Sequence, residues 1–285
     1  MLKRVAVAVV VVAIAGCSGR TVLERLGTAR QLASDLLVQF TKAADISNRA
    51  VMAGTDEASA PLAREAERAT EAVQRDADAL APLLQDLGYS KEAELLKEFG
   101  TRYAEYRSLD RTILELAVEG TNVKARRLSF GDALEAADAF VKTLGAVAPS
   151  SPAKRDRVSM LVASAVASVR EIQMLQAPHI AEADDAAMTK LEERMTAAET
   201  TARRLLDALE SQLQPASRPM FVAANATLDR FLKVHTEIVS LSRRNSNVRS
   251  LALTMNQKRT LTAACEDTLR ALQDALATRG FTGTR

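Results

Sequence analysis

The sequence predicts an all-α protein consisting of two tandem up-down four-helix bundles after a lipoprotein signal peptide. Composition, apolar spacing and an internal repeat predict this fold class. Aromatic residues make up 4% of the 285 residues, tryptophan is absent, and there are 11 glycines and 7 prolines. Such a chain, rich in Ala, Leu, Glu and Arg, is typical of helix bundles rather than sandwiches or barrels. Apolar residues recur at spacings of three and four, as amphipathic helices require.

The N-terminus has the pattern of a signal peptide. Lys3 and Arg4 are followed by an apolar run from Val5 to Ala15. As a helix this run spans roughly 16 Å, well short of the ~30 Å hydrocarbon core of a membrane, so we expect it to be cleaved. Ile14-Ala15-Gly16-Cys17 resembles the bacterial lipobox. The resemblance implies that residues 1–16 are removed and Cys17 is lipidated; the alternative is a plain signal peptide or a short uncleaved anchor.

Lipidation would place the protein on a membrane. By resemblance to lipoproteins of Gram-negative bacteria, Ser18 in place of Asp favours an exported protein on the outer membrane, facing the periplasm. The only other cysteine, Cys265, then has no partner within the chain, and its place on an apolar stripe predicts a buried core residue. Apart from Lys3 and Arg4 the chain has 36 basic and 36 acidic residues, so no nucleic-acid partner is expected.

Four helices are expected in the first half of the chain. Gly88 and Gly120 end the second and third of them, and Ser90 is the expected cap of the third. Pro82 should kink the second helix or end it early, and Gly131 weakens the fourth. The four helices are expected at residues 22–52, 59–87, 90–119 and 122–144.

The segment Ala148–Ala153 is the domain boundary that the sequence predicts, because it is the one Pro/Ser-rich stretch between helical segments. The first bundle is therefore assigned to residues 17–148 and the second to residues 149–285. Pro178, the segment 215–219 and the segment 243–247 separate the later helices. These are expected at residues 156–176, 184–214, 218–242 and 247–278.

The two halves are related at an offset of about 125 residues. Leu116, Asn122 and Val123 recur as Leu241, Asn247 and Val248. The stripe of Phe99, Tyr106 and Ile113 recurs as Ala224, Phe231 and Ile238. We interpret the repeat as two copies of one helical unit, each of which buries its own stripe.

Residue patterns typical of enzymes are absent, so no catalytic residue, metal site or cofactor is predicted. The two histidines form no Glu-x-x-His pair for a di-iron bundle, and there is no glycine-rich phosphate loop and no cysteine motif for haem or zinc. Ionisable residues interrupt the stripe at equivalent positions, Asp110 in the first half and His235 in the second. Either they are buried polar groups, which need partners in a core, or a slight helix rotation leaves them partly wet.

Basic and amide side chains gather where the helix 1–2 and helix 3–4 turns of each bundle are expected to meet. A helix N-terminus lies in each group, and its free N–H groups favour anions. These residues are candidate ligands for a small anion; the alternative is ordinary capping and solvated charge. The candidates are Asn48, Arg49, Asn122, Lys124 and Arg127 in the first group, with Arg126 beside them, and His179, Asn247 and Arg249 in the second, with Arg243, Arg244 and Asn245 beside them.

The run Ile113–Gly120, followed by Asn122–Leu128, resembles the extracytoplasmic four-helix-bundle sensor domain of methyl-accepting chemotaxis receptors. The resemblance covers residues 21–145 best and reaches the second half through the repeat, since two-unit helical sensors also occur among those receptors. It implies small-molecule binding near the membrane-distal turns, often by a homodimer. No apolar segment follows Thr278, so such a sensor would pass its signal to a partner protein.

Two functions are therefore expected as alternatives. One is a lipid-anchored extracytoplasmic module, sensor-like and non-enzymatic, that binds a small molecule or a partner protein for signal transduction. The other is a structural cell-envelope lipoprotein with no small-molecule ligand. A pocket with convergent polar groups favours the first, and a large exposed apolar stripe favours the second.

Overall fold

The computed structural model describes residues 15–279, with side chains described from residue 22 onward. Residues 1–14 and the side chain of Cys17 lie outside this range, so the signal peptide and the lipidation stay predictions. Between residues 15 and 279 the chain forms helices and no strands, apart from one isolated bridge between Pro149 and Leu213. The predicted all-α fold class is confirmed.

The described chain consists of α-helices, two π-helical turns and two short 3₁₀ turns. The α-helices are α1 (Ala15–Val51), α2 (Asp56–Asp86), α3 (Ser90–Glu119), α4 (Thr121–Leu128), α5 (Leu134–Gly145), α6 (Arg155–Ala181), α7 (Asp185–Glu210), α8 (Arg218–Arg244), α9 (Ser246–Leu253) and α10 (Arg259–Thr278). The π-helical turns are η1 (Ser129–Ala133) and η4 (Thr254–Lys258), and the 3₁₀ turns are η2 (Pro152–Lys154) and η3 (Pro215–Ser217).

Two prolines that were expected to interrupt helices lie inside them. Pro82 does not end α2, which continues to Asp86, and Pro178 lies within α6. A proline removes one helical hydrogen bond and costs about 3 kcal/mol in a helix interior. In α2 this cost is offset because Leu80 and Leu84, on either side of Pro82, are fully buried, and burying a leucine contributes about 1.5–3 kcal/mol.

The chain divides into two compact units that interleave along the sequence. Among the described residues, unit 1 contains residues 15–53, 57–118 and 251–279, and unit 2 contains residues 54–56 and 119–250. The predicted boundary at residues 148–153, between bundles 17–148 and 149–285, is therefore wrong. That segment is a turn inside unit 2, where Ser150 N donates to Gln212 O (2.8 Å) and Gln214 N donates to Ala148 O (3.3 Å). Turns within a domain use the same Pro and Ser residues as linkers do.

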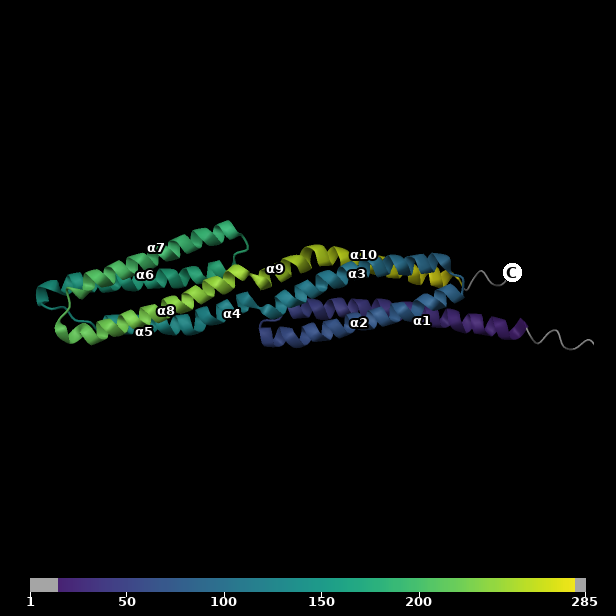
Figure 1. The fold of residues 1–285 in the computed structure, drawn as a ribbon, viewed down its shortest axis with the longest axis horizontal. Helices are drawn as coiled ribbons and strands as arrows, with labels where there is room; N and C mark the ends of the chain where they lie inside the picture. Colours follow the sequence, from purple (N-terminus) through teal and green to yellow (C-terminus); the bar gives the residue numbers. More distant parts are fainter. Residues whose placement is uncertain (1–14, 280–285) are drawn as a thin grey trace, which may run out of the picture. The chain divides into compact units, whose positions relative to one another are not determined.

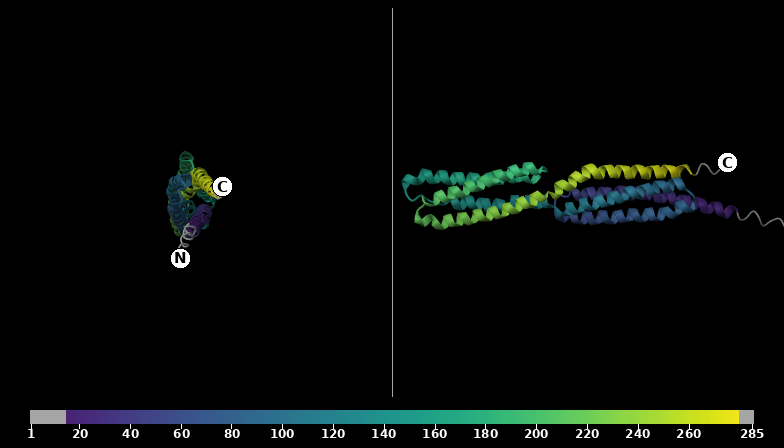
Figure 2. Two further views of the ribbon diagram at one scale, coloured as in Figure 1. Left: turned by 90° about the vertical axis from the view of Figure 1, so that its right-hand side faces the viewer. Right: turned by 45° about the horizontal axis from the view of Figure 1, so that its top comes forward.

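The core of unit 1 is formed by α1, α2, α3 and α10, so its last helix comes from the far end of the chain (Figures 1 and 2). Phe40 of α1 lies edge-on to three rings of α3, with centroid distances of 6.1 Å to Phe99, 6.0 Å to Tyr103 and 5.1 Å to Tyr106. Cys265 of α10 is fully buried beside them, as predicted. Burial raises the pKa of its thiol to about 12, so the group is inert.

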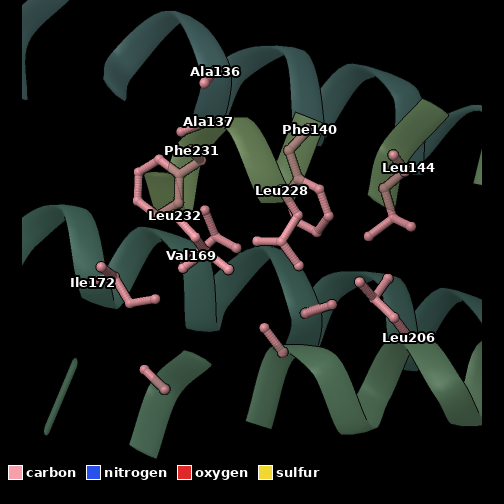
Figure 3. Packing of buried hydrophobic residues seen from close by; sticks show 14 of the residues in the cluster. Ala136, Ala137, Phe140, Leu144, Val169, Ile172, Leu206, Leu228, Phe231 and Leu232 are labelled. Atoms are coloured by element: carbon pink, nitrogen blue, oxygen red, sulfur yellow. The ribbon is translucent and has the colours of Figure 1, made fainter. Parts of the chain in front are cut away.

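The core of unit 2 lies between α5, α6, α7 and α8, whose side chains meet in the middle of the unit (Figure 3). The segment Pro152–Ala181 is long and apolar enough to cross a membrane by length and composition. In the structure its residues Leu161, Val169 and Ile172 are buried in this core. Packing within unit 2 therefore accounts for part of its apolar composition, whereas Met160 and Met174 are exposed.

Equivalent backbone features recur at the predicted offset. Gly120, before α4, and Asn245, before α9, both have left-handed conformations, with φ of 60° and 55°. Eight-residue helices follow in both cases, and then the five-residue π-helical turns η1 and η4. Glycine and asparagine are the residues that adopt this conformation most readily. The repeat thus extends to the backbone. In both halves a π-helical turn interrupts a helix that was expected to be continuous, at 122–144 and at 247–278.

Candidate functional site

The first turns of α4 and α9, both in unit 2, cap one another. Thr121 N donates to Ser246 Oγ (2.9 Å), and Ser246 N donates to Thr121 Oγ1 (3.0 Å). One residue further on, Asn122 N donates to Asn247 Oδ1 and Asn247 N donates to Asn122 Oδ1, both at 3.1 Å. The N–H groups at a helix start need such acceptors. These partners are 125 residues apart, so the repeat pairs equivalent residues with each other.

Asn122 is a structural residue in this cluster. Its amide nitrogen donates to Ile180 O (2.7 Å), at the end of α6, and to Asn245 Oδ1 (2.8 Å). Asn245 in turn donates to Glu182 O (2.9 Å). Since its amide donors and its oxygen are engaged, Asn122 holds helix ends together. Asn247 differs from Asn122. Its Oδ1 accepts hydrogen bonds from Asn122 N and Val123 N, but within residues 22–279 its Nδ2 group donates to no protein atom.

A groove of about 300 Å³ lies beside this cluster in unit 2. Its lining residues come from α4, η1, α6 and α9; they are Asn122, Val123, Arg126, Phe130, Ala177, Ile180, Ala181 and Asn247. Arg126 is exposed and forms no ion pair within the described part of the chain. Phe130 is 65% exposed, which is unusual for a large aromatic residue. The groove thus combines an apolar wall, an unpaired cation and the Nδ2 donor of Asn247.

His179 does not line this groove. The imidazole is fully buried, with Nδ1 at 2.9 Å from Ser242 Oγ and Nε2 at 2.7 Å from Glu192 Oε1. Arg243 binds the same carboxylate through Nε (2.6 Å) and Nη2 (2.9 Å). These hydrogen bonds from Arg243, with a smaller contribution from His179, lower the pKa of Glu192. The cluster joins α6, α7 and α8 and has no free group for a ligand.

Asp110 is a buried residue of unit 1, and its partners complete a polar network in the core. Its Oδ1 lies 2.8 Å from Lys258 Nζ and accepts a hydrogen bond of 2.5 Å from Ser47 Oγ. Lys258 also donates to Ser47 Oγ (2.5 Å). The Lys258 and Asp110 side chains are only 2% and 3% exposed. Burial lowers the pKa of Lys258, and the adjacent Asp110 opposes that shift.

His235 is a buried residue of unit 2 in the equivalent position. Its Nδ1 lies 3.4 Å from Gln176 Nε2, and Ser129 Oγ donates to Gln176 Oε1 (2.7 Å). Burial lowers the pKa of His235 to about 4. Of the two alternatives for Asp110 and His235, a core position or a wet helix edge, the structure shows the core position. Each network includes a residue of its unit's π-helical turn, Lys258 of η4 or Ser129 of η1.

The other candidate residues are not brought together at one site. Asn48 and Arg49 are exposed in unit 1, and Arg249 is exposed in unit 2. Lys124 donates to Glu119 O (2.8 Å) and forms a 3.7 Å ion pair with Asp56, which Arg127 also binds at 2.9 Å. The two expected groups are thus redistributed, because residues of both chain halves meet within unit 2.

Sequence reasoning missed Phe130 and Lys258. Lys258 lies three residues after Met255 and four before Thr262, so its place on the apolar stripe was a signal of burial. No comparable signal exists for Phe130, because the π-helical turn sets the direction of its side chain. No group of three or more His, Cys, Asp or Glu side chains suited to a metal ion occurs among the residues that the structure describes.

Comparison with known proteins adds no family. No protein-family model matches the chain, and no curated protein matches it.

Proposed function

We propose that this chain is a lipid-anchored, extracytoplasmic, sensor-like module of two four-helix-bundle units, and that the groove of unit 2 binds a small carboxylate with an aromatic or apolar body. The observation that supports the proposal is the composition of the groove: Arg126, which forms no ion pair among the described residues, lies beside an apolar wall. Arginine binds carboxylates through two parallel hydrogen bonds.

The remaining lining residues fit the same ligand. The free Nδ2 group of Asn247 supplies a second donor, and Phe130 and Ile180 offer an apolar surface for a ring. The lining residues of the α4–η1 segment run from Asn122 to Phe130, roughly 12 Å along a helix axis, which suits a compact ligand. Small-molecule sites have this combination of apolar walls and a few placed polar groups.

The test is calorimetric titration of the mature chain, from residue 17 onward and with Cys17→Ser, with benzoate and with benzamide. Benzoate should bind and benzamide should not, because only benzoate carries the charge that Arg126 pairs with. Arg126→Gln should weaken benzoate binding about tenfold or more, since hydrogen bonds to charged groups are worth about 1.5–3 kcal/mol. Arg249→Gln is the matched control, because Arg249 is exposed and does not line the groove.

The alternative, a structural envelope lipoprotein, predicts a different result. A panel of aromatic and aliphatic carboxylates would then show no binding that depends on Arg126, and the ligand part of the proposal would be refuted. The anchor is tested separately by labelling with a radioactive fatty acid. The wild-type chain should carry the label and Cys17→Ser should not; an unlabelled wild-type chain that is still processed contradicts lipidation.

A further inference from the structure

Unit 1 has its own groove at the position equivalent to that of unit 2. At the offset of 125 residues, Arg126 and Phe130 of unit 2 correspond to Leu251 and Met255 of unit 1, and Ala177 corresponds to Met52. This groove, of about 380 Å³, lies between the end of α1 and the continuous run of α9, η4 and α10. Its lining residues are Asn48, Val51, Met52, Leu251, Thr254, Met255, Lys258, Arg259, Thr262, Ala263 and Glu266. The repeat therefore builds the same feature twice, with different lining.

The unit 1 groove is elongated. Its lining residues run from Leu251 to Glu266 along one helical face. At about 1.5 Å per residue this is roughly 22 Å, nearly twice the corresponding length in unit 2. A compact ring would contact only a short part of this face, whereas an extended chain can follow its apolar part from Leu251 to Arg259.

The lining is also more flexible and more aliphatic. Met52, Met255 and Leu251 are 71%, 55% and 41% exposed. Methionine is unbranched and polarisable, so it adapts to ligands without a fixed shape. Large apolar side chains that collect in one groove and remain exposed mark a binding surface more often than a scattered set does.

One charge in the unit 1 groove is unpaired. Lys258 is bound to Asp110 and Ser47, and Glu266 forms a 2.7 Å ion pair with Arg270. Arg259, one residue after η4, is exposed and has no hydrogen bond or ion pair of its side chain among residues 22–279. The net charge that the groove offers to a ligand is thus positive, which favours an anionic head group.

We propose that the groove of unit 1 binds a free medium-chain fatty acid. Its acyl chain lies along Met52, Leu251 and Met255, and its carboxylate pairs with Arg259. The two units then bind carboxylates of different shape, aliphatic in unit 1 and aromatic in unit 2. This inference stands on residues of unit 1 alone and is independent of the function proposed for unit 2.

The experiment is a chain-length titration of the mature Cys17→Ser chain with octanoate, decanoate and dodecanoate. Each methylene buried in the groove should tighten binding about fourfold. With methyl-labelled methionine, decanoate should shift the NMR signals of Met52 and Met255. The signals of Met188 and Met195, which are buried in unit 2, should stay unchanged. Phosphatidylcholine vesicles should leave all four signals unchanged, because phosphatidylcholine has no free carboxylate.

Two variants test the contacts. Met255→Gln should abolish the chain-length dependence, and Arg259→Gln should weaken decanoate about tenfold while leaving decanol unaffected. Met220→Gln is the matched control, since Met220 is exposed in unit 2, and circular dichroism checks that each variant is folded. Affinity that does not rise with chain length, or decanoate binding that Met255→Gln leaves intact, overturns the proposal. Benzoate binding that Arg126→Gln leaves unchanged counts only against the function proposed for unit 2, so the two failures are distinguishable.

Discussion

The buried imidazole of His235 predicts that unit 2 loses stability on mild acidification. The side chain lies in the core between Phe231 and Gln176, and burial lowers its pKa from 6.5 to about 4. The charged groups that face it are Glu199 and Glu192, which raise the pKa, and His179, which lowers it; all of these effects are smaller than that of burial. The folded state therefore binds fewer protons than the unfolded state between pH 4 and pH 6.5.

The size of the effect follows from the pKa shift. A depressed pKa gives full stability above the unfolded value of 6.5, and stability falls as the pH drops toward about 4. The full shift corresponds to about 3 kcal/mol at 1.36 kcal/mol per pKa unit. Between pH 7.5 and pH 5 the expected loss is about 2 kcal/mol, which is about 1 M in the midpoint of a urea transition with a typical slope.

Two measurements check this prediction. The chain has two histidines, so NMR titration of the ring signals separates His235 from His179 and yields the pKa directly. Urea unfolding of the mature chain at pH 7.5 and pH 5 measures the loss of stability. His235→Leu is the control, because it keeps an apolar side chain in the core and removes the titrating group.

The reasoning is refuted if His235 titrates near pH 6.5, since the imidazole would then be solvated. It is equally refuted if wild type and His235→Leu lose the same stability on acidification. In that case other groups, such as the paired Glu192 whose pKa is lowered by Arg243, carry the pH dependence.

Three further predictions concern the buried ion pair, the left-handed glycine and the chain order of unit 1. Lys258→Met leaves Asp110 buried without its cation and should lower the free energy of unfolding, measured in urea, by about 3–5 kcal/mol. Adding Asp110→Leu should recover most of that loss, because two apolar side chains replace a buried ion pair without penalty. Gly120→Ala should destabilise the protein by about 1 kcal/mol or more, because alanine is strained at the φ of 60°. Gly100→Ala, inside α3 with open space around its Cβ position, should stabilise it by about 0.5–1 kcal/mol, and thermal unfolding of both variants measures the difference. Truncation after Ser250 removes α10 and should unfold unit 1, while the NMR signals of the unit 2 core are retained. A truncated chain that keeps the NMR signals of folded unit 1 contradicts the division into interleaved units.

Apolar periodicity was enough to predict the fold class and most helix positions. The stripe of Phe99, Tyr106 and Ile113 is fully buried, and so is its repeat. Asp110 and His235 were singled out for the same reason, because a residue three or four positions from buried neighbours shares their face. Periodicity describes which face of a helix is buried, and it identified those residues correctly.

The domain boundary could not be predicted from the sequence. Periodicity does not say which helix a given stripe packs against, so α10 was assigned to its sequence neighbours although its Cys265, Leu269 and Leu272 pack in the core of unit 1. A Pro/Ser-rich turn and a linker have the same composition, whereas the actual crossings, near Glu119 and Leu251, lie in or beside helices. The two groups of candidate ligand residues were not predicted correctly as groups for the same reason, because their grouping depended on which turns share an end.

The π-helical turns connect the two features of each unit that sequence alone does not predict. In η1, Ser129 belongs to the buried network of His235 while Phe130, its neighbour, lines the groove of unit 2. In η4, Met255 lines the groove of unit 1 and Lys258 binds Asp110 in the core. A π-helical turn inserts one extra residue into a helix, and such insertions are frequent at functional sites. Each turn has five residues, and these include both a groove residue and a residue of the buried network. A displacement of the turn therefore moves the groove residue and the network residue together. Groove and buried network are therefore parts of one structural feature, and the repeat has kept them together in both units.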